Sequence, residues 1–390
     1  MLPARRPLPR ALFHVQHLLG TGHLRRAAQL AAELVRRSGF GVTLASGGAP
    51  VANLELGGAE LLQLPPLTAS EGGLQSLVTA DGRPPDDAWR AARRDRLLRL
   101  YAELRPDLVL IEAFPFGRRA LRFELLPLLA SIAESRPRPL LVASVRDVVH
   151  ARRAPERIEE TVNLVRRHFD RVLIHGDPRL IRLDESFPAF ARIADRSHYT
   201  GMVSAAPAAV AAGLGEVIVS AGGGATGGQL FAAALAARPL SRLRHATWRL
   251  LVGGNLPEAS YQALREQAPE GVVVERSRAD FRALLAGCAV SVSQGGYNTV
   301  ADLLASAARA VIVPFEAGGE TEQGQRAMRL AELGLVQVVS EETLSGGTLA
   351  AALDRALSAA PARHSVDLAG AGRTAELLTD WLAVPREATG

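Results

Sequence analysis

Short apolar runs alternate with amphipathic stretches along the chain, and this alternation restricts the fold more than any other feature of the sequence. Strands that are apolar throughout are typical of parallel sheets, because both faces of such sheets are buried. Between two of the runs, residues 24–39 place apolar side chains at helical spacing and end at Gly39. The pattern therefore predicts repeated βα units. In the first half, the predicted strands are residues 11–16, 41–46, 107–113, 139–145 and 171–176.

A second βα series begins after residue 213. Residues 204–213 are small and uncharged and include a proline, which is typical of a linker. A chain of 390 residues is also long for a single domain. We therefore predict an α/β fold of two doubly wound, Rossmann-like domains: residues 1–203, a linker at 204–213, and residues 214–390, whose last helix can pack back on the first domain. The predicted strands of the second half lie within residues 216–229, 246–254, 271–276, 288–296 and 308–316.

Two amino-acid counts exclude several kinds of chemistry. All 45 basic residues are arginine, so Walker-type phosphate binding and lysine Schiff-base chemistry are excluded. The only cysteine, Cys288, can form no intrachain disulfide and provides too few thiolates for a cysteine-based zinc site. No run reaches the roughly 20 apolar residues that cross a bilayer, and the first ten residues lack the apolar region of a signal peptide. We therefore expect a cytoplasmic protein.

Positive charge is concentrated in the first half of the chain. Residues 1–204 hold 30 arginines against 22 acidic residues, a net charge of +8, whereas residues 205–390 carry −3. One interpretation is a set of solvated arginines on helix faces. The other is contact with a phosphate-bearing acceptor or an anionic membrane, which would place the protein peripherally at the inner face of the membrane. Nucleic acid is not an expected partner, since aromatic residues make up only 5% and no recognition motif is present.

The loop after the first predicted strand contains a candidate base. Gly20 and Gly22 precede His23 and open a helix, so the backbone can approach a ligand closely. A helix N-terminus disfavours a protonated imidazole, and His23 should therefore be neutral and basic. A purely structural histidine is the alternative. His14 and His17 are expected to be ordinary strand and loop residues.

Three loops of the second half are candidates for binding a nucleotide sugar. The glycines and hydroxyls of residues 220–228 suit a diphosphate, although a glycine-rich turn without ligand has the same sequence. The loop at residues 293–302 and the polar segment at 314–327 follow later strands and can contact a ribose diol and sugar hydroxyls. The candidate residues are Ser220, Gly222, Gly223, Gly224, Thr226, Gly295, Gly296, Asn298, Thr299, Asp302, Glu320, Glu322, Gln323 and Arg326.

These loops, in this order, resemble those of glycosyltransferase family 28. The turn GTGH resembles the glycine-rich GGTGGH turn of that family, and Gly20, Gly22, His23 and Arg26 also resemble a motif of nucleotide-sugar hydrolases on the same fold. GGYNTVAD resembles the donor-binding segment GG-x-NT-x-x-E, and VPFEAGGETEQGQRA resembles the segment VPF…Q-x-x-NA. The overall layout, with residues 111–129 and 144–147, is similar to a poorly characterised group of predicted bacterial glycosyltransferases.

The resemblance implies a GT-B fold, in which two Rossmann-like domains face each other across a cleft. It further implies that a nucleotide-diphosphate sugar, a UDP-sugar, binds to the C-terminal domain and that an acceptor binds to the N-terminal domain. Transfer would invert the anomeric carbon, with no cofactor and no obligatory metal. Two residues depart from the family pattern: Asp302 replaces the usual ribose-binding glutamate, and Arg326 replaces an asparagine and can pair with a carboxylate or phosphate on the donor.

These residues give a hypothesis for the mechanism and two rivals. His23 would take a proton from the acceptor hydroxyl, while amides of residues 222–224 stabilise the leaving diphosphate. Asp302 would hold the ribose, and Glu322 and Gln323 the donor sugar. The acceptor, a glycan, lipid or small molecule, would contact Glu112, Arg146 and Asp147, unless these residues orient His23 or form salt bridges. The rivals are a nucleotide-sugar hydrolase or epimerase and a noncatalytic protein that binds nucleotide sugars or docks on membranes.

Overall fold

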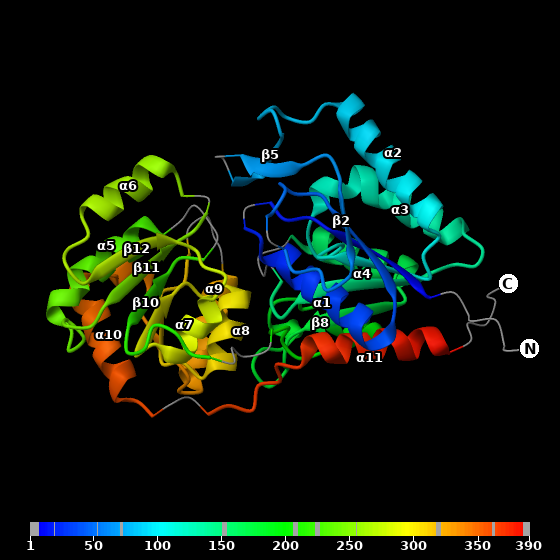
Figure 1. The fold of residues 1–390 in the computed structure, drawn as a ribbon. Helices are drawn as coiled ribbons and strands as arrows, with labels where there is room; N and C mark the ends of the chain where they lie inside the picture. The colour runs from blue at the N-terminus through cyan, green and yellow to red at the C-terminus, as the bar shows by residue number, and fades with distance from the viewer. Residues whose placement is uncertain are drawn as a thin grey trace, which may run out of the picture. The chain divides into compact units, whose positions relative to one another are not determined.

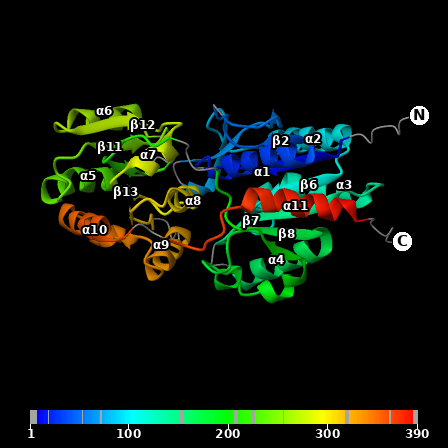
Figure 2. The ribbon, with the colours of Figure 1, turned by 60° about the horizontal axis from the view of Figure 1, so that its bottom comes forward.

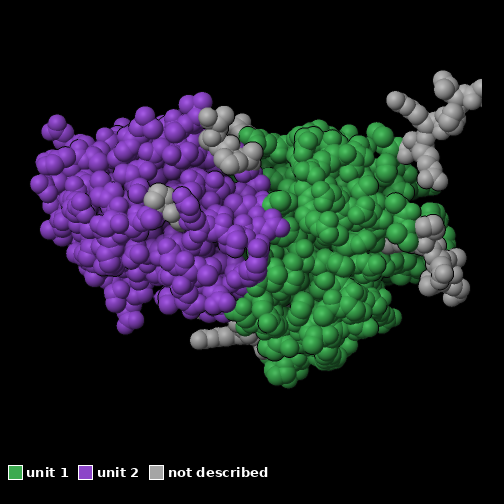
Figure 3. Space-filling model, turned by 90° about the horizontal axis from the view of Figure 1, so that it is seen from below, with its two compact units in different colours: residues 1–178, 182–203, 369–390 green, residues 179–181, 204–368 purple. Residues whose placement is uncertain are grey.

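The computed structural model shows two compact units (Figure 3). Unit 1 comprises residues 1–178, 182–203 and 369–390, and unit 2 comprises residues 179–181 and 204–368. The chain leaves unit 1 after Val203 and returns at Ala369, and these two residues form an isolated antiparallel bridge. The structure describes residues 8–18, 20–52, 54–70, 73–149, 154–205, 210–222, 227–254, 256–316, 321–360 and 363–384.

Unit 1 contains a parallel sheet of seven strands, to which the labelled β2 and β8 of Figure 1 belong. The order of its strands is β3-β2-β1-β6-β7-β8-β9. These strands are β1 (Arg10–Val15), β2 (Gly41–Ser46), β3 (Glu60–Gln63), β6 (Leu108–Glu112), β7 (Leu140–Arg146), β8 (Arg171–His175) and β9 (Ser197–Tyr199). A separate antiparallel hairpin consists of β4 (Leu67–Ser70) and β5 (Gly73–Thr79). The helices are α1 (Gly22–Ser38), α2 (Asp87–Leu104), α3 (Arg122–Glu134), α4 (Pro155–His168) and α11 (Gly370–Ala383), with 3₁₀ turns at Arg119–Leu121, Leu183–Glu185, Phe190–Arg192 and Ala194–Arg196.

Both faces of this sheet are buried, as its apolar strands require. In β1, Leu12 packs into the core with α2, α3 and α4, whereas the next residue, Phe13, packs into the core with α1 and α11. Helix α11, from the end of the chain, lies beside α1 (Figure 2). Arg37 donates to Glu376 at 2.9 Å across this helix pair. The last helix therefore completes the core of unit 1.

Unit 2 contains a parallel sheet of six strands in the order β12-β11-β10-β13-β14-β15. Its strands are β10 (Val217–Ser220), β11 (Trp248–Val252), β12 (Val272–Arg276), β13 (Val290–Ser293), β14 (Ala310–Ile312) and β15 (Gln337–Val338). Its helices are α5 (Gly228–Ala237), α6 (Glu258–Glu266), α7 (Phe281–Gly287), α8 (Tyr297–Ser306), α9 (Glu322–Glu332) and α10 (Gly346–Ser358), with 3₁₀ turns at Arg238–Leu240 and Glu341–Thr343. The predicted α/β class and the two Rossmann-like sheets are confirmed.

Each sheet has one point at which the order of its strands reverses. In unit 1 the chain proceeds from β1 outward to β3 and then returns to β6 on the other side of β1. In unit 2 it proceeds from β10 outward to β12 and then returns to β13. Loops diverge at such a switch point and leave a crevice beyond the carboxyl ends of the strands, where doubly wound sheets bind ligands. The topology thus places one candidate site in each unit.

Candidate functional site

The switch point of unit 1 brings His23 and Glu112 together. Helix α1 begins at Gly22, so His23 lies in its first turn, just beyond β1. Glu112 is the last residue of β6, the strand on the other side of the switch point. His23 Nδ1 lies 2.7 Å from Glu112 Oε1. Sequence reasoning singled out both residues, and the fold makes them a hydrogen-bonded pair.

Glu112 is an ionised carboxylate within the core. Arg26, also buried, forms an ion pair with the same Oε1 atom. Burial alone would raise the pKa of Glu112, but His23 and Arg26 outweigh burial and hold this pKa well below its usual range. Because a carboxylate only accepts hydrogen bonds, His23 Nδ1 carries the proton and donates it. The lone pair of Nε2 is then available to accept a proton from a ligand.

His23 is neutral over the whole physiological pH range. Burial is the largest cause that lowers its pKa, and the positive charges of Arg146 and Arg118 lower it further. Together they outweigh the Glu112 carboxylate and place the pKa at about 3. The side chain nevertheless keeps 17% of its surface exposed, so a ligand can reach it. This environment agrees with the predicted neutral imidazole, whereas a pKa of about 3 makes the side chain less basic than an ordinary histidine and not more so.

A second histidine lies behind this pair and was not singled out from the sequence. His175 ends β8, and its Nε2 lies 2.8 Å from the hydroxyl of Ser144, the residue paired in register with Glu112. Its Nδ1 lies 3.0 Å from Thr200 Oγ1. Burial lowers the pKa of His175 to about 3, so this side chain is also neutral. The signal in the sequence was a histidine at the carboxyl end of an apolar strand.

The switch point of unit 2 is lined by small residues. Ser220 and Ser293 end β10 and β13 and are paired in register across these strands. Ser220 Oγ accepts a hydrogen bond from the Gly222 amide at 3.3 Å, and Gly222 has a positive φ of 70°. This backbone conformation favours glycine. The predicted residues Gly223, Gly224, Thr226 and Glu320 lie outside the described residues.

Arg326 ties together two of the predicted loops of unit 2. Its completely buried side chain donates from Nη1 to the Gly295 carbonyl at 2.8 Å, and its guanidinium lies 5.7 Å from the centre of the Tyr297 ring. Gln323, at the start of α9, accepts a hydrogen bond at 3.1 Å from the backbone amide of Phe315 through its Oε1. Gln323 therefore keeps only its Nε2 group for donation to a ligand. The arginine at position 326 supports the turn that precedes α8.

Asp302 is a largely buried acid on α8, and the neighbouring predicted residues Gly296, Asn298 and Thr299 belong to the start of that helix. Burial raises the pKa of Asp302 from 3.8 to about 6, although the positive charge of Arg282 on α7 partly opposes this effect. The carboxylate is thus held in an environment that penalises its charge. Glu322 occupies the first turn of α9.

Neither a metal cluster nor a membrane-crossing helix is found in the described parts of the chain. No group of three or more His, Cys, Asp or Glu residues there could hold a metal ion. No helix there is long and apolar enough to span a bilayer.

Solved structures with the same architecture are glycosyltransferases. CalG4, the calicheamicin glycosyltransferase, has a TM-score of 0.62 at 18% identity, with 96% of this chain and 98% of that chain covered. MurG of Acinetobacter baumannii has a TM-score of 0.57 at 17% identity, with 95% and 100% covered. The spinosyn rhamnosyltransferase SpnG, complexed with thymidine diphosphate, has a TM-score of 0.58 at 16% identity, with 96% of each chain covered. The chain therefore has the GT-B fold.

The second half of the sequence is similar to one known domain family. Residues 218–376 match the model of the glycosyltransferase family 28 C-terminal domain, a match over less than half of the chain. No curated protein matches the sequence. The chain thus combines a GT-B fold with a second half that is similar to the family 28 C-terminal domain.

Proposed function

We propose that this enzyme transfers a sugar from a nucleotide-diphosphate donor, a UDP-sugar, to an acceptor hydroxyl with inversion and without a metal. The observation that carries the proposal is the His23–Glu112 pair at the switch point of unit 1. It combines a neutral imidazole, an exposed edge and an ionised partner, which are the properties that a general base needs. The acceptor would bind to unit 1 and the donor to unit 2.

In this proposal, His23 Nε2 accepts the proton of the acceptor hydroxyl as that oxygen attacks the anomeric carbon. The bond from this carbon to the diphosphate oxygen breaks at the same time, so a single displacement inverts the configuration. The resulting imidazolium is stabilised by Glu112, which already receives a hydrogen bond from Nδ1. General base catalysis of this kind contributes roughly 10²–10⁴ in rate.

The donor would bind at the switch point of unit 2. The N-termini of α5 and α8 begin at loops that follow β10 and β13, and helix N-termini stabilise the charge of a diphosphate. Asp302 would accept hydrogen bonds from the ribose diol, and Glu322 and Gln323 would contact the sugar. Arg326 would act by fixing the Gly295 turn, to which it is hydrogen-bonded. The backbone amides at these helix N-termini would stabilise the leaving group without a divalent cation.

The first experiment is a thermal-shift screen of UDP- and TDP-sugars, because a ligand that binds the folded state raises the melting temperature by mass action. Release of nucleotide diphosphate is then measured with and without a panel of glycan, lipid and small-molecule hydroxyls. Acceptor-dependent release supports transfer. Release that is equally fast without any acceptor would instead assign a hydrolase.

The role of the base is tested with His23→Ala in the same assay. We expect transfer to fall by roughly 10²–10⁴, while the thermal shift with the nucleotide sugar is unchanged because the donor-binding residues belong to unit 2. His17→Ala is a matched control, since this buried histidine of the same loop region has its Nε2 3.0 Å from the Ala49 carbonyl and has no role in the proposal. A transfer rate of His23→Ala within a few-fold of the wild-type rate would rule out His23 as the base.

Peripheral contact with an anionic membrane is a second part of the proposal, and the net charge of +8 over residues 1–204 supports it. The test is cosedimentation with phosphatidylserine vesicles at 50 and 300 mM salt. We expect binding that salt weakens and that neutral phosphatidylcholine vesicles do not support. Equal recovery with both kinds of vesicle would contradict it.

A further inference from the structure

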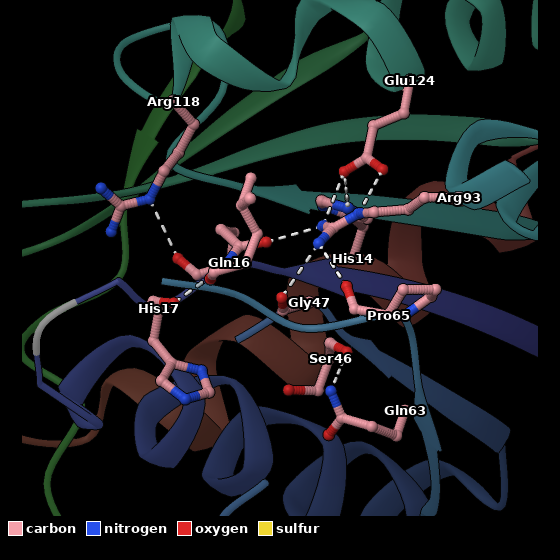
Figure 4. Close-up of polar contacts among 11 residues, drawn as sticks. His14, Gln16, His17, Ser46, Gly47, Gln63, Pro65, Arg93, Arg118 and Glu124 are labelled. Atoms are coloured by element: carbon pink, nitrogen blue, oxygen red, sulfur yellow. Dashed lines mark hydrogen bonds and ion pairs between the residues drawn. The ribbon is translucent and has the colours of Figure 1, made fainter. Parts of the chain in front are cut away.

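A buried arginine of α2 binds the carboxyl ends of three neighbouring strands in unit 1 (Figure 4). Arg93 Nη2 donates to Gln16 Oε1 at 2.7 Å, and Nη1 donates to the carbonyls of Gly47 at 3.0 Å and Pro65 at 2.7 Å. Gln16 directly follows β1, Gly47 directly follows β2, and Pro65 lies two residues beyond β3. One side chain thereby holds the loops of three adjacent strands at the edge of the sheet that also carries His23.

The other acceptor of Arg93 is a carboxylate on α3. Nε donates to Glu124 Oε2 at 2.7 Å and Nη2 donates to Glu124 Oε1 at 2.9 Å, and both side chains are completely buried. The five hydrogen bonds match the five N–H groups of a guanidinium. Movement of any of the three loops would leave a buried donor without a partner, which is costly in a low-dielectric interior.

Gln16 extends this network toward the turn that carries His23. Its Nε2 donates to the carbonyls of His17 at 2.9 Å and Leu67 at 2.7 Å, so both ends of the amide are used. Its own carbonyl accepts from Arg118 Nε at 2.9 Å. The segment that leads from β1 to the first turn of α1 is thus fixed at its beginning by Arg93 and Gln16.

We propose that Arg93 is a positioning residue for sugar transfer, which fixes the loops after β1, β2 and β3 and, through Gln16, the turn that carries His23. The inference rests on the proposed function, because it concerns the same base. Arg93 touches no reacting atom. Its loss should therefore lower kcat and loosen these loops, while the KM for the donor, whose proposed site is in unit 2, stays the same.

The variants separate positioning from stability. Arg93→Met alone leaves the buried Glu124 charge unpaired and is expected to destabilise unit 1. Arg93→Met combined with Glu124→Gln removes both charges at similar volume and keeps an acceptor for His14, whose Nε2 lies 3.3 Å from Glu124 Oε1. Arg93→Lys retains the charge but has only three donors for five hydrogen bonds, so it should rescue kcat only in part.

An arginine at the opposite edge of the same sheet provides a matched control. Arg138 Nη1 donates to both carboxylate oxygens of Asp170 at 2.9 Å, and its Nη2 donates to the His168 carbonyl at 2.7 Å. These residues precede the starts of β7 and β8, at the amino ends of the strands. Arg138→Met removes an arginine–carboxylate pair that is partly exposed, without touching the loops at the carboxyl ends.

Hydrogen exchange by mass spectrometry and steady-state kinetics on the full chain test the proposal, with the best donor from the screen of UDP- and TDP-sugars. In the double variant we expect amide exchange at residues 16–18, 47–48, 64 and 67 to rise at least tenfold, and kcat to fall at least tenfold with an unchanged donor KM. Arg138→Met should change neither.

The proposal would be overturned if the double variant exchanged these amides as slowly as the wild type. It would also be overturned if the double variant exchanged them faster but kept the kcat of the wild type. If the wild type turns over no nucleotide sugar, the proposed function fails. Loop exchange in the double variant then still decides whether Arg93 holds the three loops.

Discussion

Asp302→Asn should make unit 2 more stable at neutral pH and weaken donor binding at the same time. Burial raises the pKa of Asp302 from 3.8 to about 6. The folded state therefore holds the proton in a pH range where the unfolded chain has released it. The free energy of unfolding falls as pH rises from about 4 to about 6, and the full penalty is present above pH 6.

The size of this effect follows from the shift in pKa. A shift of about two units corresponds to about 3 kcal/mol at pH 8 and to less than about 1 kcal/mol at pH 4. Asparagine has no charge to bury, so the free energy of unfolding of the variant should exceed that of the wild type by these amounts. The measurement needs a probe for unit 2 alone. Trp248 lies in the core of unit 2, whereas Trp89 and Trp381 belong to unit 1.

Urea unfolding is therefore followed by tryptophan fluorescence in a Trp89→Phe/Trp381→Phe background. Asp280→Asn is the control with the opposite sign, because its hydrogen bond to Arg278 lowers the pKa of Asp280. The reasoning would be refuted if Asp302→Asn changed the free energy of unfolding of this background by the same amount at pH 4 and at pH 8. Isothermal titration with the donor should show weaker binding to the variant, since an amide cannot replace a carboxylate as double acceptor for a diol.

Three further substitutions give distinct outcomes. Glu112→Gln removes the buried ion pair with Arg26 and the charge that stabilises an imidazolium, so both the melting temperature and kcat should fall, and a kcat within two-fold of wild type would contradict its role. Arg146→Met removes a charge that lowers the pKa of His23, so the acid limb of the pH–rate profile should move to higher pH, and an unmoved limb would argue against that charge. Arg326→Met leaves the Gly295 carbonyl without its donor, and calorimetry should show roughly tenfold weaker donor binding, whereas an unchanged affinity would show that the turn needs no such support.

The fold could be predicted from the sequence because parallel strands are apolar along their whole length. Predicted strands such as residues 41–46 and 171–176 coincide with β2 and β8 to within one residue. The same dependence on apolar runs explains why shorter strands were not predicted. β9 has three residues and β15 has two, and both are only partly buried, so they contain no apolar run to detect. The hairpin of β4 and β5 lies outside the sheets and follows no βα pattern.

The site could be predicted only in part, because its geometry depends on contacts between residues far apart in the chain. His23 was found from its local glycine turn. Its pairing with Glu112 depends on β1 and β6 being neighbours, which the order of strands decides. Arg93 gave no signal at all, since its position on α2 is that of an ordinary helix arginine and its acceptors lie 28 to 77 residues away.

The two units have similar topologies, but different residue types occupy their switch points. In unit 1, the charged side chains of Glu112 and Arg26 are buried beside the neutral His23, whose Nδ1 proton is bonded to Glu112. In unit 2, small residues such as Ser220 and Ser293 end the strands, and the N-termini of α5 and α8 follow them. Fixed ionised side chains suit the transfer of a proton, which needs one defined acceptor atom. Exposed backbone amides at helix N-termini suit an extended anion, since they stabilise charge without a full countercharge. The residue types at the two points where the strand order reverses therefore support the proposal of a base in unit 1 and a donor site in unit 2.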